Sequence, residues 1–382
     1  MSMKLTLQTQ LLPDADQAAK LAATVERFNA AANWLAGLAF ERKVSNKFVL
    51  QRLCYAELRK RFGLPADTAI RCIAQVVEAY KRDKDKRPEF REHAAVPFSM
   101  GKNIGFKGPD RVSISTLTGR VIVPFIMGKY QAERFGWSHG QCDLVLRRDG
   151  KWFLLVTVDA PDGTPVEPSG FIGVDLGVKD LATTDDGTTF KGDDVEACRR
   201  KYHRIRKTCQ GRGTKSARRK LAKVREKEGR FKRNENHVIA KRVVEKAKGT
   251  GCAIGVEDLM GISTRTTVSK PQRSRMKGWA FFQLRRFISY KAMLAGVPVV
   301  PVDPRNTSRM CSECGHTEKA NRKSRDEFEC RHCGFTCCAD RNAARNIRDR
   351  AERDWAVVGR PIVGVDDAGL GPRSRLLTSR LL

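Results

Sequence analysis

Long apolar runs are missing from this sequence. No run of apolar residues approaches the roughly 20 that a helix needs to span a bilayer. The opening stretch MSMKLTLQTQLLPD has no extended apolar segment behind its single lysine, which argues against a secretory signal peptide. We therefore expect an intracellular protein with no membrane partner.

Acidic residues are scarce relative to basic ones. The chain has 73 Lys and Arg residues against 43 Asp and Glu, for a formal net charge of +30. Such a surplus opposes a compact state unless a polyanion neutralises it. Nucleic acid is the polyanion we favour, because each phosphate contact releases counterions. A basic surface that is only solvated and an anionic membrane are the alternatives, and no basic amphipathic helix beside an apolar segment supports the second.

The order of patterns along the chain predicts a multidomain α/β protein. With 382 residues, 41% of them hydrophobic, the chain is long enough for two or three folded domains. Residues 3–11 alternate like a strand, residues 14–86 show helical spacing, and residues 96–162 return to strand patterns. The segment CDLVLRRDGKWFLLVTVDA predicts a hairpin, with Asp149 and Gly150 in a type I′ turn. The Pro- and Gly-rich residues 161–170 form the best domain boundary.

The second half begins with strand patterns and then becomes strongly basic. Residues 194–248 have helical spacing, and the Gly-Arg-Gly at 211–213 predicts a break that makes a helical hairpin. This hairpin could line a nucleic-acid duplex, or it could be a solvated pair of helices. A further apolar strand, a helix and another strand precede a cluster of cysteines.

Three acids lie in settings that match a metal site. Asp175 follows a strand pattern in FIGVDLG, Glu257 follows a similar Ile-Gly-Val in AIGVEDL, and Asp340 begins the helical pattern of CADRNAARNI. Three clustered carboxylates would repel one another and be driven towards protonation unless cations lay between them. Hard divalent ions such as Mg²⁺ prefer oxygen ligands, and two of them about 4 Å apart can act on a scissile phosphate.

Each acid alone could instead be a helix cap or an ion-pair partner. The neighbouring Asp180, Asp185, Asp186 and Asp258 are expected to serve turns or to support the site. Asp258 directly follows Glu257, and side chains alternate along a strand, so only one of the two can face the site.

The cysteine cluster predicts a second, structural metal site. Six of the 12 cysteines fall within residues 311–338, in a chain that we expect to be intracellular. Cys311-x2-Cys314 and Cys330-x2-Cys333 are two knuckles, each followed by Gly, with the spacing of a tetrahedral four-cysteine zinc site. His316 and His332 could replace a cysteine but lie off this spacing. The remaining two, Cys337 and Cys338, are expected to pack against the ribbon.

The motifs together resemble the TnpB family of transposon-encoded, RNA-guided nucleases from insertion sequences, and the related compact type V CRISPR effectors. The matching segments occur in the family's order: GVDLGVKDLAT, IGVEDL, GWAFFQLRRFISYKA, TSRMCSECG, CRHCGF and DRNAARNI. The likeness covers roughly residues 171–350. One departure is Cys338, where many relatives carry an additional acid two residues before the third metal ligand.

The resemblance implies a domain plan. An RNase H-like (RuvC) nuclease domain would comprise residues 166–310 and 334–353, with a zinc ribbon inserted at residues 311–333. A wedge β-barrel would comprise residues 1–12 and 96–165, with a helical recognition domain at residues 13–95 inserted into it. Residues 354–382 are expected to be a disordered tail.

The resemblance also implies a function and its partners. The chain would be an RNA-guided DNA endonuclease, a monomeric ribonucleoprotein of the prokaryotic cytoplasm that binds a noncoding (omega) guide RNA and cleaves double-stranded target DNA beside a short motif. Asp175, Glu257 and Asp340 would hold two catalytic Mg²⁺, and Cys311, Cys314, Cys330 and Cys333 one structural Zn²⁺. A helix of the first half offers Arg71, Gln75 and Lys81 as candidates to read the adjacent motif.

Two rival functions remain at this point. A guide-dependent DNA-binding repressor of transcription that does not cut is one, although such relatives typically lose at least one of the acids. A transposase that joins DNA ends is the other, and it fits poorly because no separate end-binding domain is apparent in the sequence.

Overall fold

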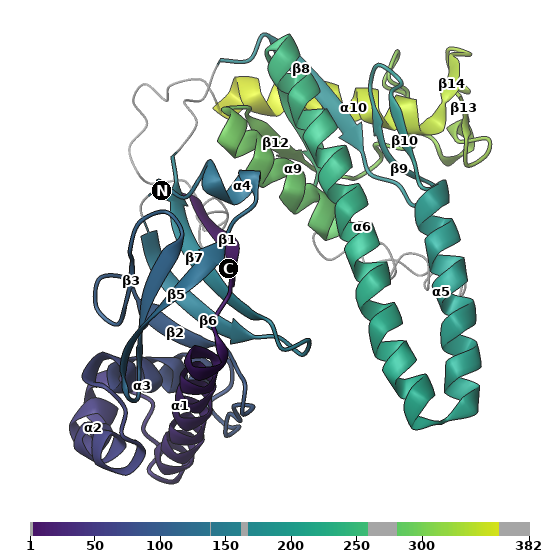
Figure 1. Ribbon diagram of the computed structural model, residues 1–382. Helices are drawn as coiled ribbons and strands as arrows, with labels where there is room; N and C mark the ends of the chain where they lie inside the picture. Colours follow the sequence, from purple (N-terminus) through teal and green to yellow (C-terminus); the bar gives the residue numbers. More distant parts are fainter. Residues whose placement is uncertain (1–2, 138, 162–166, 259–280, 359–382) are drawn as a thin grey trace. The chain divides into compact units, whose positions relative to one another are not determined.

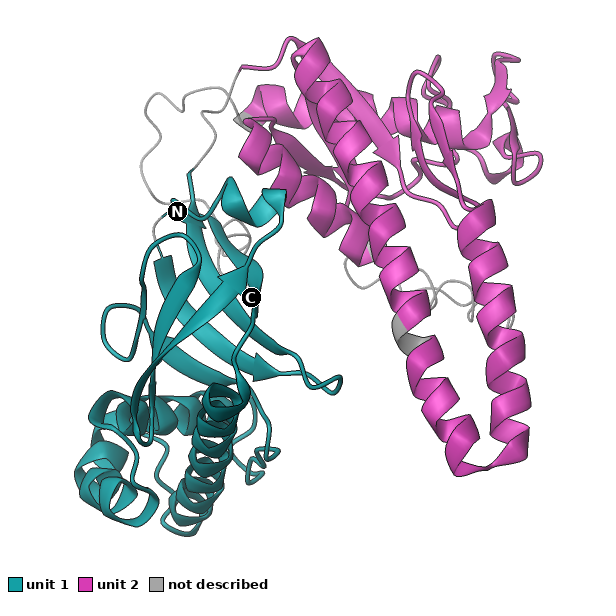
Figure 2. Cartoon of the chain, in the orientation of Figure 1, with its two compact units in different colours: residues 1–161 teal, residues 162–382 magenta. Residues whose placement is uncertain are grey.

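The chain divides into two compact units. The computed structural model describes residues 3–137, 139–161, 167–258 and 281–358. Unit 1 is Met1–Pro161 and unit 2 is Asp162–Leu382 (Figure 2). The division falls within the predicted Pro- and Gly-rich boundary at residues 161–170. In the described part of the chain, none of the helices is both long enough and apolar enough to cross a membrane.

Unit 1 is built on a curved, nearly closed antiparallel sheet (Figure 1). Its strands run β2–β6–β7–β1–β5–β4–β3 across the sheet. They are β1 (Met3–Leu11), β2 (Val96–Ser99), β3 (Ile104–Phe106), β4 (Arg111–Thr116), β5 (Gly119–Ile126), β6 (His139–Leu146) and β7 (Trp152–Ala160). The first strand thus pairs with the predicted hairpin, because β1 lies between β7 and β5.

Three helices lie between β1 and β2 in the chain and cover one end of this sheet (Figure 1). They are α1 (Ala15–Glu41), α2 (Lys47–Phe62) and α3 (Ala66–Tyr80), and a short α4 (Lys129–Ala132) follows β5. A capping box starts α1, in which the Asp14 side chain accepts from the Gln17 amide. Helices and strands share one core, to which Phe28 of α1, Phe98 of β2 and Leu154 of β7 all belong.

The turn between β6 and β7 differs from the predicted type I′ turn. A type I′ turn needs two consecutive residues with positive φ. Gly150 has φ +78°, but Asp149 does not have a positive φ. The Arg147 amide donates to the Lys151 carbonyl at 2.9 Å and the Gly150 amide to the Arg147 carbonyl at 2.9 Å. The loop is therefore three residues long, with Gly150 supplying the single left-handed position.

Unit 2 is built on a five-stranded mixed sheet in the order β10–β9–β8–β11–β12. Its strands are β8 (Gly170–Asp175), β9 (Asp180–Thr184), β10 (Thr189–Lys191), β11 (Cys252–Glu257) and β12 (Val299–Val302). The three strands β8, β11 and β12 are parallel, whereas β9 and β10 run as an antiparallel meander on the edge beyond β8. The carboxyl ends of β8 and β11 consequently meet at one edge of the sheet.

Long helices surround this sheet and extend beyond it. The basic segment forms α5 (Asp193–Arg212) and α6 (Lys215–Thr250), a hairpin that turns at Gly213, φ +63°, as predicted (Figure 1). One face of the sheet packs on α6 and α9 (Phe281–Ala295), through Ile172, Val174, Ile254 and Val256. The opposite face packs on α10 (Ala339–Val358). This last helix reaches Val358, past the predicted limit at residue 353, and the rest of the predicted tail lies outside the described residues.

Two paired glycines let α10 lie directly on the sheet. Gly173 of β8 and Gly255 of β11 are partners in the parallel register. A Cβ atom at Gly173 would lie 1.9 Å from the Ala344 carbonyl oxygen, and one at Gly255 would lie 2.7 Å from the Ala351 Cβ. Neither distance is compatible with a real side chain, so the glycine of each Ile-Gly-Val motif is the place where the helix crosses the strand.

Candidate active site and metal centre

The strand alternation puts the first two acids on the face that α10 covers. Ile172 and Val174 point into the core on the α6 side, so Gly173 and Asp175 point to the other side. The same alternation in β11 places Gly255 and Glu257 on the α10 face. Val174 and Val256 are register partners, so the residues that follow them, Asp175 and Glu257, end adjacent parallel strands side by side.

Helix α10 brings the third acid to the same edge. Ala344, Ile347, Arg348 and Ala351 are the residues of α10 that approach Gly173 and Gly255. Asp340 lies four residues before Ala344, in the first turn of the helix and on the same helical face. Glu257 is 7% exposed, and the side chain of Asp340 is 16% exposed. The sequence-predicted acids therefore converge at the carboxyl ends of β8 and β11.

Burial raises the pKa of all three acids, and repulsion by the other two acts on Asp175. The pKa of Asp175 is raised well above its ordinary value by burial and by the charges of Glu257 and Asp340. Burial also raises the pKa of Glu257 and that of Asp340. Such shifts are the signature of a site where carboxylates are held together without enough positive charge.

Two side chains that sequence reasoning missed act on these acids. Thr307 donates its hydroxyl to Glu257 Oε1 at 2.5 Å, which lowers the pKa of Glu257 against the effect of burial. Arg322 Nη2 lies 3.4 Å from Asp340 Oδ1, and its charge opposes the rise in pKa of both Asp340 and Asp175. Thr307 belongs to the motif TSRMCSECG, whereas Arg322 is one of 73 basic residues with no distinguishing pattern.

Neighbouring acids are engaged in other contacts. Asp185 accepts from the Gly173 amide at 3.1 Å and lies 3.4 Å from Arg348 of α10, so it fastens β8 to this helix. Asp186 binds Lys246 and the Thr184 hydroxyl. Asp258 forms an ion pair with Arg285, while the preceding Glu257 is the one on the α10 face, as strand alternation requires.

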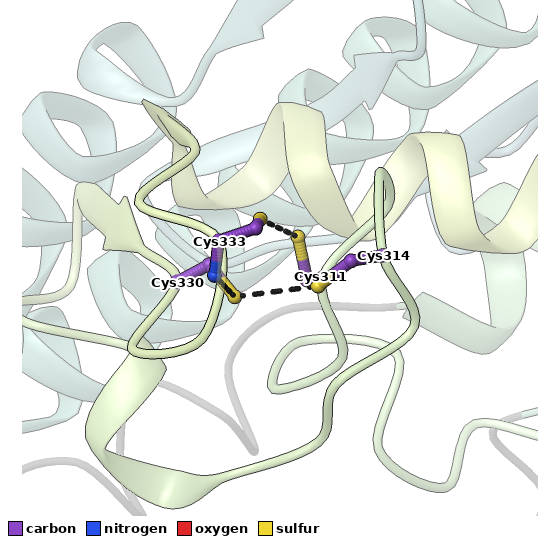
Figure 3. A group of neighbouring side chains, drawn as sticks. All are labelled: Cys311, Cys314, Cys330 and Cys333. Carbon is purple, nitrogen blue, oxygen red and sulfur yellow. Dashed lines mark hydrogen bonds between the residues drawn. The ribbon is translucent and has the colours of Figure 1, made fainter.

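The four knuckle cysteines form a compact sulfur cluster (Figure 3). Cys311 Sγ lies 3.7 Å from Cys333 Sγ, and Cys314 Sγ lies 3.6 Å from Cys330 Sγ. All four ligand atoms lie within 4.8 Å of one another. Four sulfurs at 2.3 Å from a tetrahedral ion would be separated by about 3.8 Å, so the cluster has the size of a structural metal site.

The two knuckles have the same backbone geometry. In the first, the Cys311 amide donates to the His316 carbonyl and the Gly315 amide donates to the Cys311 carbonyl. In the second, the corresponding bonds join Cys330 with Phe335 and Gly334 with Cys330. Gly315 and Gly334 both have φ +74°, which explains why glycine follows each pair of cysteines. The hairpin of β13 (Glu327–Glu329) and β14 (Thr336–Cys338) extends this ribbon past the predicted limit at residue 333.

Two asparagines of α10 connect the sulfur cluster with the acids. Asn342 donates to the Met310 carbonyl at 2.7 Å and accepts from the Ser312 amide at 3.0 Å. Asn346 donates to the Thr307 carbonyl at 2.8 Å and to the Met310 carbonyl at 2.7 Å. Both asparagines are buried. The segment from Thr307, which binds Glu257, to the first knuckle is thus held on the helix that carries Asp340.

The candidate motif-reading residues all lie on or just after α3 in unit 1. Arg71 donates to the Ser99 hydroxyl and, at 3.2 Å, to Gln141 Oε1, so it connects α3 to β2 and β6. Gln75 donates to the Ala95 carbonyl at 3.4 Å. Lys81 forms an exposed ion pair with Glu78 at 2.7 Å. Their contact with DNA stays a prediction.

The sequence matches two described families of protein domain. Residues 154–265 match the family described as "Probable transposase" (OrfB_IS605), and residues 281–347 match the "Cas12f1-like, TNB domain". The first match covers β8, β11 and the basic hairpin, and the second covers the cysteine knuckles and the start of α10.

Curated proteins with related sequences carry names that agree with these matches. The putative RNA-guided DNA endonuclease InsQ of Escherichia coli K12 is 31% identical over 283 residues, which cover 68% of this chain and 69% of InsQ. A CRISPR-associated endodeoxyribonuclease Cas12f1 of Syntrophomonas palmitatica is 30% identical over 312 residues. That alignment covers 75% of this chain but only 62% of the relative's length. A TnpB-like protein of Methanocaldococcus jannaschii is 32% identical over 138 residues, 35% of this chain and 49% of that protein.

Solved structures share the fold. The Cas12f1 chain of a Cas12f1–sgRNA–target DNA complex superposes with a TM-score of 0.63 at 14% identity, covering 91% of this chain and 98% of that one. The mini-RNA-guided endonuclease CRISPR-Cas_phi3 gives a TM-score of 0.57 at 12% identity, covering 95% and 94%. The sequence comparisons show that the chain belongs to the TnpB family.

Proposed function

We propose that this protein is an RNA-guided endonuclease that cleaves double-stranded DNA in one acidic site. The observation that carries the proposal is the convergence of Asp175, Glu257 and Asp340 on one face of the unit 2 sheet. Burial raises the pKa of all three, and the charges of Glu257 and Asp340 raise the pKa of Asp175 further. Three acids held together at buried or half-buried positions are costly to maintain, and a reaction that needs the carboxylates accounts for them.

The topology of unit 2 supports an RNase H-like (RuvC) assignment. The sheet has three parallel strands flanked by an antiparallel meander, with acids at the ends of two adjacent parallel strands and at the start of the helix that crosses them. InsQ, which is similar over two thirds of its length, is named a putative RNA-guided DNA endonuclease.

The donor set of the acidic site fits hard divalent cations, and we assign it two Mg²⁺. Carboxylate oxygens are the ligands that hard divalent cations prefer. Two such ions about 4 Å apart can act together on one phosphate group. When bound, the pair would provide Lewis acidity for the water nucleophile and for the leaving oxygen.

Residues of the chain itself orient the site. Thr307 holds one oxygen of Glu257 through its hydroxyl bond and leaves the other oxygen of that carboxylate for a ligand. Arg322 places a guanidinium beside Asp340, where it can also contact a phosphate oxygen of a bound substrate. Asp340 lies in the first turn of α10, and the positive end of the helix dipole favours its ionised form.

The sulfur cluster would hold one structural Zn²⁺. Four cysteines leave no open coordination position, so this ion would have no direct part in the reaction. Its role would be to fold the segment that carries Arg322, and, through Asn342 and Asn346, to fix the segment that carries Thr307.

The proposed partners are a noncoding guide RNA and double-stranded target DNA. The net charge of +30 suits a monomeric ribonucleoprotein that grips nucleic-acid backbones and delegates sequence to base pairing. In this proposal the basic α5–α6 hairpin binds the guide–target duplex, and Arg71, Gln75 and Lys81 are the candidates for reading the adjacent motif.

The test is plasmid cleavage by the protein copurified with its RNA. With Mg²⁺ and a plasmid that matches the guide, we expect linear DNA from the wild type and none from Asp175→Ala, Glu257→Ala or Asp340→Ala. Asp193→Ala, an acid in the first turn of α5, is the matched control and should cut normally. Cleavage by the Asp175→Ala variant, or cleavage that persists in EDTA, would exclude the proposed site.

Binding measurements separate a nuclease from a repressor that does not cut. A matched plasmid that is bound but never cleaved by the wild type in Mg²⁺ would favour the repressor. A protein that purifies without RNA and cuts DNA in that form would contradict the guided mechanism.

A further inference from the structure

The tip of the α5–α6 hairpin carries positive charge that no acid in the described chain neutralises. The 29 residues from 197 to 225 contain 13 Lys and Arg and no Asp or Glu. Nearer the sheet, Glu196 pairs with Arg199 and Arg200, and the buried Glu228 pairs with Arg206 and Lys232. The hairpin therefore neutralises part of its charge along its length but leaves its tip, the end remote from the sheet in Figure 1, strongly cationic.

A cavity of about 290 Å³ lies at this tip, between the last turns of α5 and the first turns of α6. Its cationic lining is Arg204, Arg212 and Lys220, and its hydroxyl lining is Thr208, Thr214 and Ser216. In the described part of the chain, none of the three cationic side chains forms an ion pair. The buried Cys209 and Ala217, with the half-buried Ile205, give the cavity an apolar floor.

The hydrogen-bonding groups around the cavity favour an anion. Thr214 caps α6 by accepting from the Ala217 amide at 3.2 Å. The amides of Lys215 and Ser216 belong to the first turn of a 36-residue helix, where no intrahelical carbonyl is available to them. Two guanidinium forks, the Lys220 ammonium group and the hydroxyls of Thr214 and Ser216 thus line one space beside an apolar floor, at the start of this helix. The Thr208 hydroxyl at the same rim donates to the Arg204 carbonyl at 3.1 Å. A phosphate at the cationic rim with a sugar against the floor satisfies both parts of this lining.

We propose that this cavity binds a backbone phosphate of the nucleic acid, with its sugar against Cys209 and Ala217. The inference rests on the proposed function and deepens it, because it assigns the hairpin tip one defined phosphodiester contact in addition to diffuse attraction. The phosphate can come from single-stranded guide RNA or from the guide–target duplex, and two probes distinguish these sources.

The experiment measures binding of the full-length protein, freed of RNA at high salt, with no divalent cation added. The probes are a fluorescein-labelled RNA strand and an RNA–DNA heteroduplex of about 20 base pairs. For Arg204→Gln/Arg212→Gln/Lys220→Gln we expect Kd to rise about tenfold. On the heteroduplex we expect the slope of log Kd against log salt concentration to fall by about 0.9, the value for one phosphate contact. The probe with the larger loss identifies the source of the phosphate.

Two further variants separate a built site from general charge. Lys207→Gln/Lys223→Gln/Lys227→Gln removes the same charge from exposed positions of the hairpin outside the cavity and should lose less affinity. Arg204→Lys/Arg212→Lys keeps the charge but loses the guanidinium forks, and it should still weaken binding. Equal losses in the two triple variants, together with full binding by the lysine variant, would overturn the site and leave the proposed function intact. A wild type that binds neither probe would overturn both. Unchanged thermal melting shows that the variants are folded.

Discussion

The absence of one methyl group at Gly173 decides how closely α10 can approach the sheet. At this position a Cβ atom would lie 1.9 Å from the Ala344 carbonyl oxygen and 2.6 Å from the Arg348 amide nitrogen. Both contacts are to helix backbone, which cannot rotate away as a side chain can. The acid two residues later, Asp175, depends on this approach, because Asp340 is carried by the same helix.

Gly173→Ala should therefore destabilise unit 2 and abolish cleavage. We expect a loss of about 1–3 kcal/mol or more in the free energy of unfolding, typical of overpacking in a core. Urea unfolding measures this loss, and plasmid cleavage measures the effect on the site. Gly229→Ala is the control: its Cβ would meet nothing within 4 Å, and Gly→Ala inside a helix stabilises by about 0.5–1 kcal/mol. Equal stability of the two variants would contradict the close approach.

The raised pKa of Asp175 makes a prediction about stability in the absence of divalent cations. The folded protein holds the proton of Asp175 more tightly than the unfolded chain does, where the pKa of Asp is about 3.9. The stabilisation that this difference provides is fully present below that pH. It is lost as pH rises through the folded pKa. Asp175→Asn removes the charge, so we expect a higher melting temperature than the wild type at pH 7 and a shrinking difference towards pH 3.

A control of opposite sign is available for this measurement. Although partial burial acts against it, contacts with Lys246, Thr184 and Thr188 lower the pKa of Asp186. Asp186→Asn should therefore melt below the wild type at pH 7.

Added Mg²⁺ should stabilise the wild type but not Asp175→Asn, since a ligand stabilises only the state that binds it. A destabilised Asp175→Asn in metal-free buffer would show that repulsion does not dominate at this position.

At the residue scale, the sequence predicts the three acids better than it predicts the side chains that contact them. Asp175 and Glu257 follow recognisable strand patterns, and Asp340 begins a helix, so their convergence can be anticipated from alternation and chain order. Thr307 and Arg322 reach the acids from a segment whose path is decided by the cysteine knuckles. No periodicity in the sequence reports that path, and their roles become visible only in the folded structure.

At the scale of elements, α10 connects the sulfur cluster to the acids. Asn342 and Asn346 satisfy backbone groups between Thr307 and Ser312 that would otherwise be buried without partners. The sequence segment DRNAARN indicates the helix but not this bonding, because asparagine inside a helix has no single expected partner. The β6–β7 turn was mispredicted for a related reason: Asp149-Gly150 fits two loop lengths, and the strand register decides between them.

Asn342→Leu tests the connection. The Ser312 amide would lose its partner, and the Met310 carbonyl would keep only the bond from Asn346. An unsatisfied buried group costs about 1–3 kcal/mol. We expect a lower free energy of unfolding, weaker zinc retention against a chelator, and slower cleavage. The exposed Asn234→Leu on α6 should change stability by less than about 0.5 kcal/mol. Full zinc retention and normal cleavage by Asn342→Leu would show that ribbon and acids are independent.

At the scale of the whole molecule, the chain combines two units that have separate cores with one acidic triad among its described residues. Unit 1 has a core shared by its helices and curved sheet, and unit 2 has cores on both faces of its own sheet. The boundary between them was predictable from its Pro- and Gly-rich composition, and the family resemblance implied a barrel in the first half. The strand order of that sheet was not predictable, since it is set by long-range pairing. Only unit 2 carries the converging acids.

Under the proposed function, one triad would have to cut the two strands of a DNA duplex in turn. On a supercoiled plasmid that matches the guide, we expect nicked circles to accumulate first and linear DNA to appear as they decay, with both steps requiring Mg²⁺. A time course on an agarose gel resolves the three forms. Because the same carboxylates would serve both cuts, Glu257→Gln should reduce nicking and linearisation together by about 100-fold or more, as expected when a group essential to the reaction is lost. Linear DNA that forms without a nicked intermediate, or a Glu257→Gln variant that nicks at the wild-type rate but cannot linearise, would require a second cleavage site.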